Sequence, residues 1–315
     1  MRRLTGVGLA LAGALAISPD ALCLLLASRH STAATVTFAR LVLCGAAYFA
    51  IGLGRRERLP WTWEAAVLAV LVGYITAAMT FAFLFTYTAT AVVLFALGPV
   101  WAALMSYFWL GDPLERRTVC AIVLAIVGVG IIAGSVNGSD LVGSALAFFA
   151  GICYAAYLTI VRRARLQDIA YLAGAGCLGA ASILIAVVPV AVPTTPLFYG
   201  AVAGSVAGAC AFYVAQGRAV YYITAAETSL CTIIEVPFAA TWVYLACNQT
   251  PPLATLCAGA LIVLVLLVHE SIPVLCDTAI TVPVDDTKNA VDSKDSDASD
   301  AVNSSFASYG ATDQP

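Results

Sequence analysis

Charge is scarce in this sequence. Only 10% of the 315 residues are charged and 62% are hydrophobic, whereas a soluble domain carries about 25% charged residues. The mean hydropathy is +0.94. Water cannot solvate a surface of this composition, so a water-soluble globular protein is excluded. The solvent of this chain is expected to be membrane lipid.

Histidine is almost absent, and the ten cysteines are scattered, with no CxxC pair or Cys/His cluster of metal-binding spacing. No HExxH, GxSxG or phosphate-binding loop occurs. The segment GAGCLG at 174–179 does not follow a strand, so we interpret its glycines as helix-packing residues. We therefore expect no metal, no cofactor, no nucleic-acid partner and no enzymatic activity.

Long apolar runs dominate what is present. They are continuous, whereas a barrel strand alternates over about 10 residues, and each approaches the roughly 20 residues of a spanning helix. We predict an all-α integral membrane protein with ten transmembrane helices, in contact with lipid. The windows are 5–27, 33–53, 64–86, 89–110, 117–134, 140–160, 169–189, 198–220, 223–246 and 252–269.

Charge distribution sets the expected topology. Arginines gather in alternate connections, at 2–3, 55–58, 116–117 and 162–165, which predicts that these connections are cytoplasmic. Ten spans then place both termini in the cytoplasm of a multi-pass protein whose host membrane stays open. Residues 271–315 hold eight Asp and two Lys, with few apolar groups after Val284, so we expect a disordered acidic tail.

The two halves of the chain resemble each other. TATAVVLFALGPVWAALMSYFWLGDP at 88–113 aligns with AETSLCTIIEVPFAATWVYLACNQTP at 226–251, with Pro99 opposite Pro237 (237 − 99 = 138). Five helices per half would place the second half upside down, as in many secondary transporters. We therefore predict inverted five-helix repeats over 1–136 and 137–270.

The paired prolines are expected to allow a bend in each helix. Glu235 has no acidic partner, because Leu97 stands at the equivalent position. At mid-membrane depth, an unpaired carboxylate costs several kcal/mol. Glu235 is thus either a group that binds and releases a proton or a neutral residue bonded to a neighbouring helix.

Asp20 and Arg40 lie on consecutive helices joined by SRHST. Each is about seven residues from that loop, hence about 10 Å deep at 1.5 Å per residue, so we predict an ion pair. It is either a structural bridge or a substrate contact. Tyr74, Trp101 and Tyr213 are further candidates for lining a cavity, with core packing as the alternative.

The pattern resembles the EamA-type ten-helix members of the drug/metabolite transporter superfamily. The resemblance rests on VTFARLVL in the second helix, on LFALGPVWAALMSYFWLGDPLERRTVCAIVLAIVGVGII at 94–132, and on a second copy from Ile233. The turn LGDP has Asp112 for the family's usual Glu, and the second copy, CNQTPP, lacks the acid. The resemblance implies two inverted halves, a central cavity and alternating access.

Our leading hypothesis is a secondary active transporter, exporting or exchanging a small organic metabolite such as an amino acid or amine, with proton coupling through Glu235 or Asp20. One alternative is a nucleotide-sugar or phosphorylated-metabolite antiporter, although dianionic phosphate favours two or more buried cations. Another is a non-transporting receptor or scaffold acting through the acidic tail. Neither the solute nor the oligomeric state follows from the sequence.

Overall fold

The computed structural model describes residues 2–57, 62–110, 140–164, 169–191, 195–223 and 225–253, with a few single residues and short stretches between 123 and 264. One compact unit spans Met1–Glu270. The LGDP turn and the acidic tail lie outside the described residues.

Every regular element in these described ranges is a helix, as predicted. Their order is α1 (Arg2–Ile17), α2 (Asp20–Ser28), α3 (Ala33–Arg55), α4 (Trp63–Phe85), α5 (Thr88–Phe95), α6 (Gly98–Leu110), α8 (Leu141–Ala164), α9 (Ala170–Val187), α10 (Pro196–Ala219), α11 (Ala225–Cys231), the short 3₁₀ helix η1 (Thr232–Ile234) and α12 (Glu235–Cys247).

Among the described residues, eight stretches of helix are long and apolar enough to cross a membrane. They coincide with eight of the ten windows expected from the sequence. The windows 117–134 and 252–269 fall largely outside the described residues, so the total of ten stays a prediction.

Three of the spans are interrupted near their middle. Ser18 and Pro19 separate α1 from α2, Ala96 and Leu97 separate α5 from α6, and η1 separates α11 from α12. Proline removes a backbone donor and clashes with the preceding turn, which favours such breaks. The last two breaks precede Pro99 and Pro237 at equivalent positions of the two aligned segments, as the proline pair predicts.

Helix ends follow local chemistry. The Thr32 and Thr62 side chains accept hydrogen bonds from the backbone of the first turn of α3 and α4, at 3.3 Å each. Arg56 and Asn248 adopt left-handed backbone conformations just after α3 and α12, with φ of 54° and 51°, as helix C-terminal residues often do.

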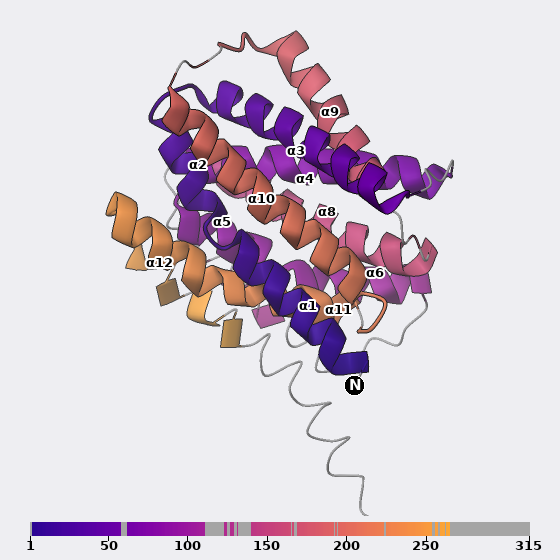
Figure 1. The fold of residues 1–315 in the computed structure, drawn as a ribbon. Coiled ribbons are helices and arrows are strands. Elements are labelled where there is room, and N and C mark those ends of the chain that lie inside the picture. Colours follow the sequence, from indigo (N-terminus) through magenta and orange to yellow (C-terminus); the bar gives the residue numbers. More distant parts are fainter. Residues whose placement is uncertain are drawn as a thin grey trace, which may run out of the picture. The chain divides into compact units, whose positions relative to one another are not determined.

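Packing relates the two halves pairwise (Figure 1). Helix α4 packs on α8 and α9, while α10 packs on α1, α2 and α3; α3 packs against α9; α6 contacts α11 and α5 contacts α12. The predicted repeat pairs α1 with α8, α3 with α9 and α4 with α10. Under that pairing, the contacting pair α4–α8 corresponds to the contacting pair α10–α1, and α4–α9 corresponds to α10–α3. The inverted repeat itself stays a prediction.

Glycines permit the tightest of these contacts. A Cβ atom on Gly176 of α9 would lie 1.8 Å from the Ala69 carbonyl oxygen of α4, and one on Gly73 would lie 2.3 Å from the Gly176 oxygen. The two backbones therefore touch where neither residue has a side chain. This contact supports the packing interpretation of GAGCLG.

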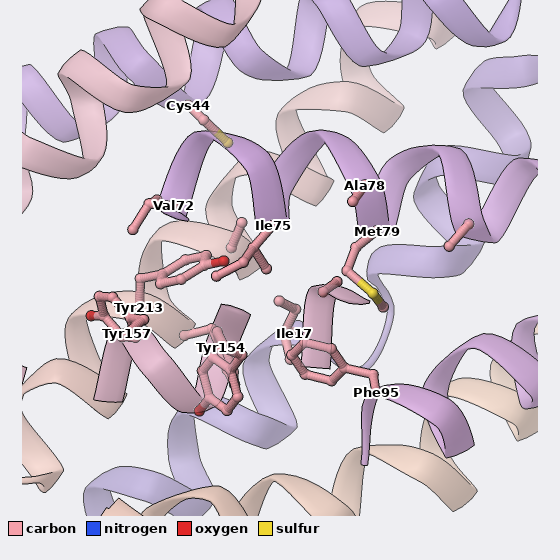
Figure 2. Packing of buried hydrophobic residues seen from close by; sticks show 14 of the residues in the cluster. Ile17, Cys44, Val72, Ile75, Ala78, Met79, Phe95, Tyr154, Tyr157 and Tyr213 are labelled. Carbon is pink, nitrogen blue, oxygen red and sulfur yellow. The ribbon is translucent and has the colours of Figure 1, made fainter. Parts of the chain in front are cut away.

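Aromatic rings fill the centre of the bundle. Tyr154 and Tyr157 of α8 meet Phe212 and Tyr213 of α10, with ring centroids 5.6 Å apart for Tyr154–Phe212 and for Tyr157–Tyr213. Figure 2 shows Tyr154, Tyr157 and Tyr213 on one side of this core and Ile17, Met79 and Phe95 on the other. The charged side chains described next lie beside this cluster.

Candidate functional site

A buried ion pair links α2 and α3. Arg40 Nη2 donates to Asp20 Oδ2 at 2.6 Å, and both residues are 3% exposed. Ser205 of α10 donates to the other carboxylate oxygen at 2.5 Å, and Arg40 Nη1 donates to Thr80 Oγ1 of α4 at 2.8 Å. The predicted pair is therefore present, and hydrogen bonds from two further helices hold it.

The break in the first span places Asp20. It is the first residue of α2 and follows Pro19, so its carboxylate lies at the positive end of the helix dipole. The Thr80 hydroxyl in turn donates a hydrogen bond to the Thr76 carbonyl at 2.7 Å. Arg40 Nε has no hydrogen-bond partner among the described residues, which leaves one donor of the buried guanidinium available.

Glu235 occupies the corresponding place in another interrupted span, as the first residue of α12. It is 5% exposed, and no hydrogen bond or ion pair joins it to another residue of the described ranges. Asp20 and Glu235 thus each begin the second half of an interrupted span. Asp20 has an ion-pair partner and a further hydrogen bond, whereas Glu235 has neither among the described residues.

Glu235 lines two small cavities. One is shared with Asp20, Arg40 and Tyr213 and leaves about 30 Å³ for the centres of water molecules. The other lies toward Pro99 and Tyr154 and leaves about 10 Å³. Sites for small organic ligands measure about 300–1,000 Å³. The molecule is therefore closed around this site, and a metabolite can enter only if helices move apart.

Apolar and aromatic side chains complete the larger of these cavities. They come from α1, α4, α5 and α10, and several are visible in Figure 2; they are Ile17, Ile75, Met79, Phe83, Phe95 and Phe212. Such walls exclude water and strengthen the electrostatic interactions of Asp20, Arg40 and Glu235.

Not all predicted site residues meet here. Pro99 and Tyr213 line the two cavities, whereas Trp101 packs edge-on against Phe148, with ring centroids 5.5 Å apart. Pro237 lies exposed on α12, and its carbonyl accepts a hydrogen bond from Thr241 at 2.6 Å. It is not among the residues that line the two small cavities.

Tyr74 lies apart from the central cavities. It is 37% exposed and lines a separate apolar groove between α4 and α9, while its neighbours Ile75, Thr76 and Met79 face the centre. Tyr74 and Tyr213 therefore line different cavities. One position along a helix turns a side chain by about 100°, so Tyr74 points away from the centre although Ile75 faces it.

Sequence reasoning missed the residues that support the charges. Thr80 and Ser205 complete the ion pair, and Thr232 and Gln216 form a buried polar contact beside Glu235, with Gln216 Nε2 3.3 Å from Thr232 Oγ1. A hydroxyl or amide in an apolar helix gives little signal by itself. Within the described part of the chain, no group of His, Cys, Asp and Glu has the arrangement of a metal site.

Comparisons with known proteins agree with this architecture. Residues 4–134 match the EamA-like transporter family. No curated protein matches the chain, whereas 27 chains of solved structures do. One of them, described as "Crystal structure of protein", has a TM-score of 0.62 and 21% sequence identity, and the alignment covers 84% of this chain and 98% of the other. This similarity concerns the fold alone.

Proposed function

We propose that this protein is a secondary active transporter of a small organic metabolite, because residues 4–134 match the EamA-like transporter family, part of the drug/metabolite transporter superfamily. Amino acids and amines are the solutes that fit best, with proton coupling through Glu235. A multi-pass membrane protein with eight apolar spans among its described residues is the setting that such transport requires.

The observation that carries this proposal is the closed cavity between Asp20, Arg40 and Glu235. Charged groups inside a membrane span are costly and mark substrate or ion pathways. Half-helix ends near the membrane centre are recurrent substrate and ion sites in secondary transporters. A purely structural role would account for the paired residues but not for the buried Glu235.

The chemistry of the cavity favours a solute with an amine. A Glu235 carboxylate can accept hydrogen bonds from an ammonium group, and the aromatic rings nearby can contact a cation through their faces. A solute carboxylate could take the Arg40 Nε donor. Phosphorylated solutes fit less well, since Arg40 is the only basic residue buried in the described spans and Asp20 already binds it.

Alternating access would use the interrupted spans. The breaks before Pro99 and Pro237 lie beside the cavities that must widen, and these two spans cross, with α5 against α12 and α6 against α11. We propose that they bend in turn and open the cavity to either side. The paired packing of the two halves supports inverted repeats over residues 1–136 and 137–270.

Transport assays test the function directly. The full-length protein is reconstituted in liposomes, and uptake of radiolabelled amino acids, amines and nucleotide sugars is measured with and without an imposed pH gradient. We expect flux of an amine-bearing solute that responds to the gradient. Absence of flux for the whole panel, under every gradient, would overturn the proposal, and flux of nucleotide sugars alone would replace the solute class.

The topology can be tested separately. We propose that both termini are cytoplasmic, so residues 50–60 and 160–166 should lie on the same side of the membrane. Accessibility labelling of single cysteines placed in these segments of a cysteine-depleted variant, in sealed cells, should give equal protection. Opposite protection would contradict both the orientation and the inverted repeat.

A further inference from the structure

Helix α11 lies beside the end of the bundle where α1 begins (Figure 1), and buried polar side chains of the α11–α12 span lead from there to Glu235. Thr228, Thr232 and Glu235 are spaced four and three residues apart and therefore share one helical face. All three are buried. Glu227 directly precedes Thr228; its Oε1 atom lies 2.6 Å from Arg3 Nη2, and the Arg3 and Glu227 side chains are 58% and 26% exposed.

Thr232 is the junction of this row. Gln216 Nε2 donates to Thr232 Oγ1 and to the Ala10 carbonyl, at 3.3 Å each. Thr232 donates to the Thr228 carbonyl at 3.4 Å, and the Tyr154 hydroxyl lies 3.3 Å from the Thr232 hydroxyl. Polar groups from α1, α8, α10 and the α11–α12 span thus converge on one buried point.

One polar atom at this junction, Gln216 Oε1, has no hydrogen-bond partner among the described residues. It belongs to the side chain whose Nε2 donates to Thr232. Buried polar atoms in proteins are nearly always bonded to protein or to ordered water. This oxygen is therefore suited to hold a water molecule inside the bundle.

The smaller cavity continues the row to Glu235. Its polar lining consists of Tyr154, Ser229, Thr232 and Glu235, and it leaves about 10 Å³ for the centre of a water molecule. That is about the space of one water, which needs two to four polar partners. A single water there can bridge the Thr232 hydroxyl and the Glu235 carboxyl group.

We infer that protons reach Glu235 from the end of the bundle that carries Arg3 and Glu227, through water held along Gln216, Thr232 and Tyr154. The water in the small cavity gives one proton to a carboxylate oxygen of Glu235 and receives one from the water or hydroxyl behind it. Release reverses these transfers. The use of this path in transport rests on the proposed function, but the path itself does not.

The surroundings of Glu235 make it the group that changes charge. The titratable and charged groups that line its cavities from other helices are Asp20 of α2, Arg40 of α3, Tyr154 of α8 and Tyr213 of α10. Asp20 and Arg40 bind each other, so their charges cancel. Apart from them, the cavity beyond Glu235 is lined mainly by apolar and aromatic side chains, which favours water entry from the Thr232 side.

Hydrogen–deuterium exchange of the Glu235 carboxyl group tests the path without any solute. The full-length protein in liposomes is mixed with heavy water, and the infrared band of the protonated carboxyl is followed; Glu235→Gln identifies the band by its loss. Thr232→Val should slow exchange about tenfold, the rate equivalent of one lost buried hydrogen bond. Thr232→Ser keeps the hydroxyl and should restore it.

Matched variants exclude a general effect of substitution. Thr241→Val removes an exposed hydroxyl on α12, the helix that begins with Glu235; this hydroxyl bonds only to the preceding turn. The Glu235 carboxyl group of this variant should exchange at the wild-type rate. Tyr154→Phe removes a second hydroxyl of the path without removing the ring, so it serves if Thr232→Val does not fold. Tyr244→Phe, on the exposed face of α12, is its control.

The outcomes separate the path from the transport function. Wild-type exchange rates in both Thr232→Val and Tyr154→Phe would overturn the path even if solute flux is observed. Slowed exchange in a protein that moves no solute would support the path and remove the proposed function. If the protein moves solute and exchange is slowed in Thr232→Val, this variant should also lower the gradient-driven flux about tenfold while solute affinity stays unchanged.

Discussion

Arg40→Met is the sharpest test of the buried ion pair. The substitution keeps a long flexible side chain but removes the donor that lies 2.6 Å from Asp20. Asp20 then retains Ser205 as a donor, yet its charge stays buried without a counter-charge. Removing one member of a buried pair destabilises a protein by about 3–5 kcal/mol. Thr80 loses a hydrogen bond as well.

The expected loss is large enough to measure by thermal unfolding in detergent, followed by tryptophan fluorescence. At roughly 2–4 °C per kcal/mol for a chain of this size, Tm should fall by about 6–20 °C. Asp20 needs no counter-charge once it is protonated, so the deficit should be greatest at neutral pH and shrink as pH falls. Asp20→Asn combined with Arg40→Met should recover part of the stability.

Arg3→Met is the control at an exposed ion pair. The Arg3 side chain is 58% exposed and lies 2.6 Å from the Glu227 carboxylate, which is itself 26% exposed, and such surface pairs contribute about 0–1 kcal/mol. Equal Tm shifts for Arg40→Met and Arg3→Met, or a deficit that does not change with pH, would refute the view that Asp20 depends on Arg40 as its counter-charge.

Two further predictions follow from the packing and from the unpaired acid. Gly176→Ala should lower stability by about 1–3 kcal/mol, because the new methyl group meets a backbone oxygen of α4; Gly179→Ala on the same helix meets open space and should be neutral in the same unfolding assay. Glu235→Gln should abolish the pH dependence of solute flux in liposomes, whereas Glu64→Gln, at the start of α4, should keep it. An unchanged pH profile in Glu235→Gln would remove this residue from the coupling.

Some of the site could be predicted because it depends on depth alone. Asp20 and Arg40 flank one short loop, so equal distance from that loop fixed their common depth and allowed the ion pair to be anticipated. Glu235 could be placed near the membrane centre by the same counting. The helix breaks before Pro99 and Pro237 follow from the missing backbone donor, which is a property of the residue itself.

Rotation of the helices could not be predicted. Helix α4 is apolar on nearly every face, so periodicity does not distinguish the face of Tyr74 from the face of Thr76 and Met79. The groups that hold the charges, Thr80 and Ser205, are ordinary residues for a transmembrane helix. Only their meeting with Arg40 and Asp20 gives them a role.

The sequence by itself determined the solvent of this protein, its spanning segments, the depth of its buried charges and the places where helices bend, because these depend on composition and on neighbours along the chain. The tertiary structure decided that Glu235 shares a cavity with Asp20 and Arg40, and that Thr232 and Gln216 form its polar approach. Those contacts depend on which faces of distant helices meet, and close packing of glycines and aromatic rings between the helices sets that choice.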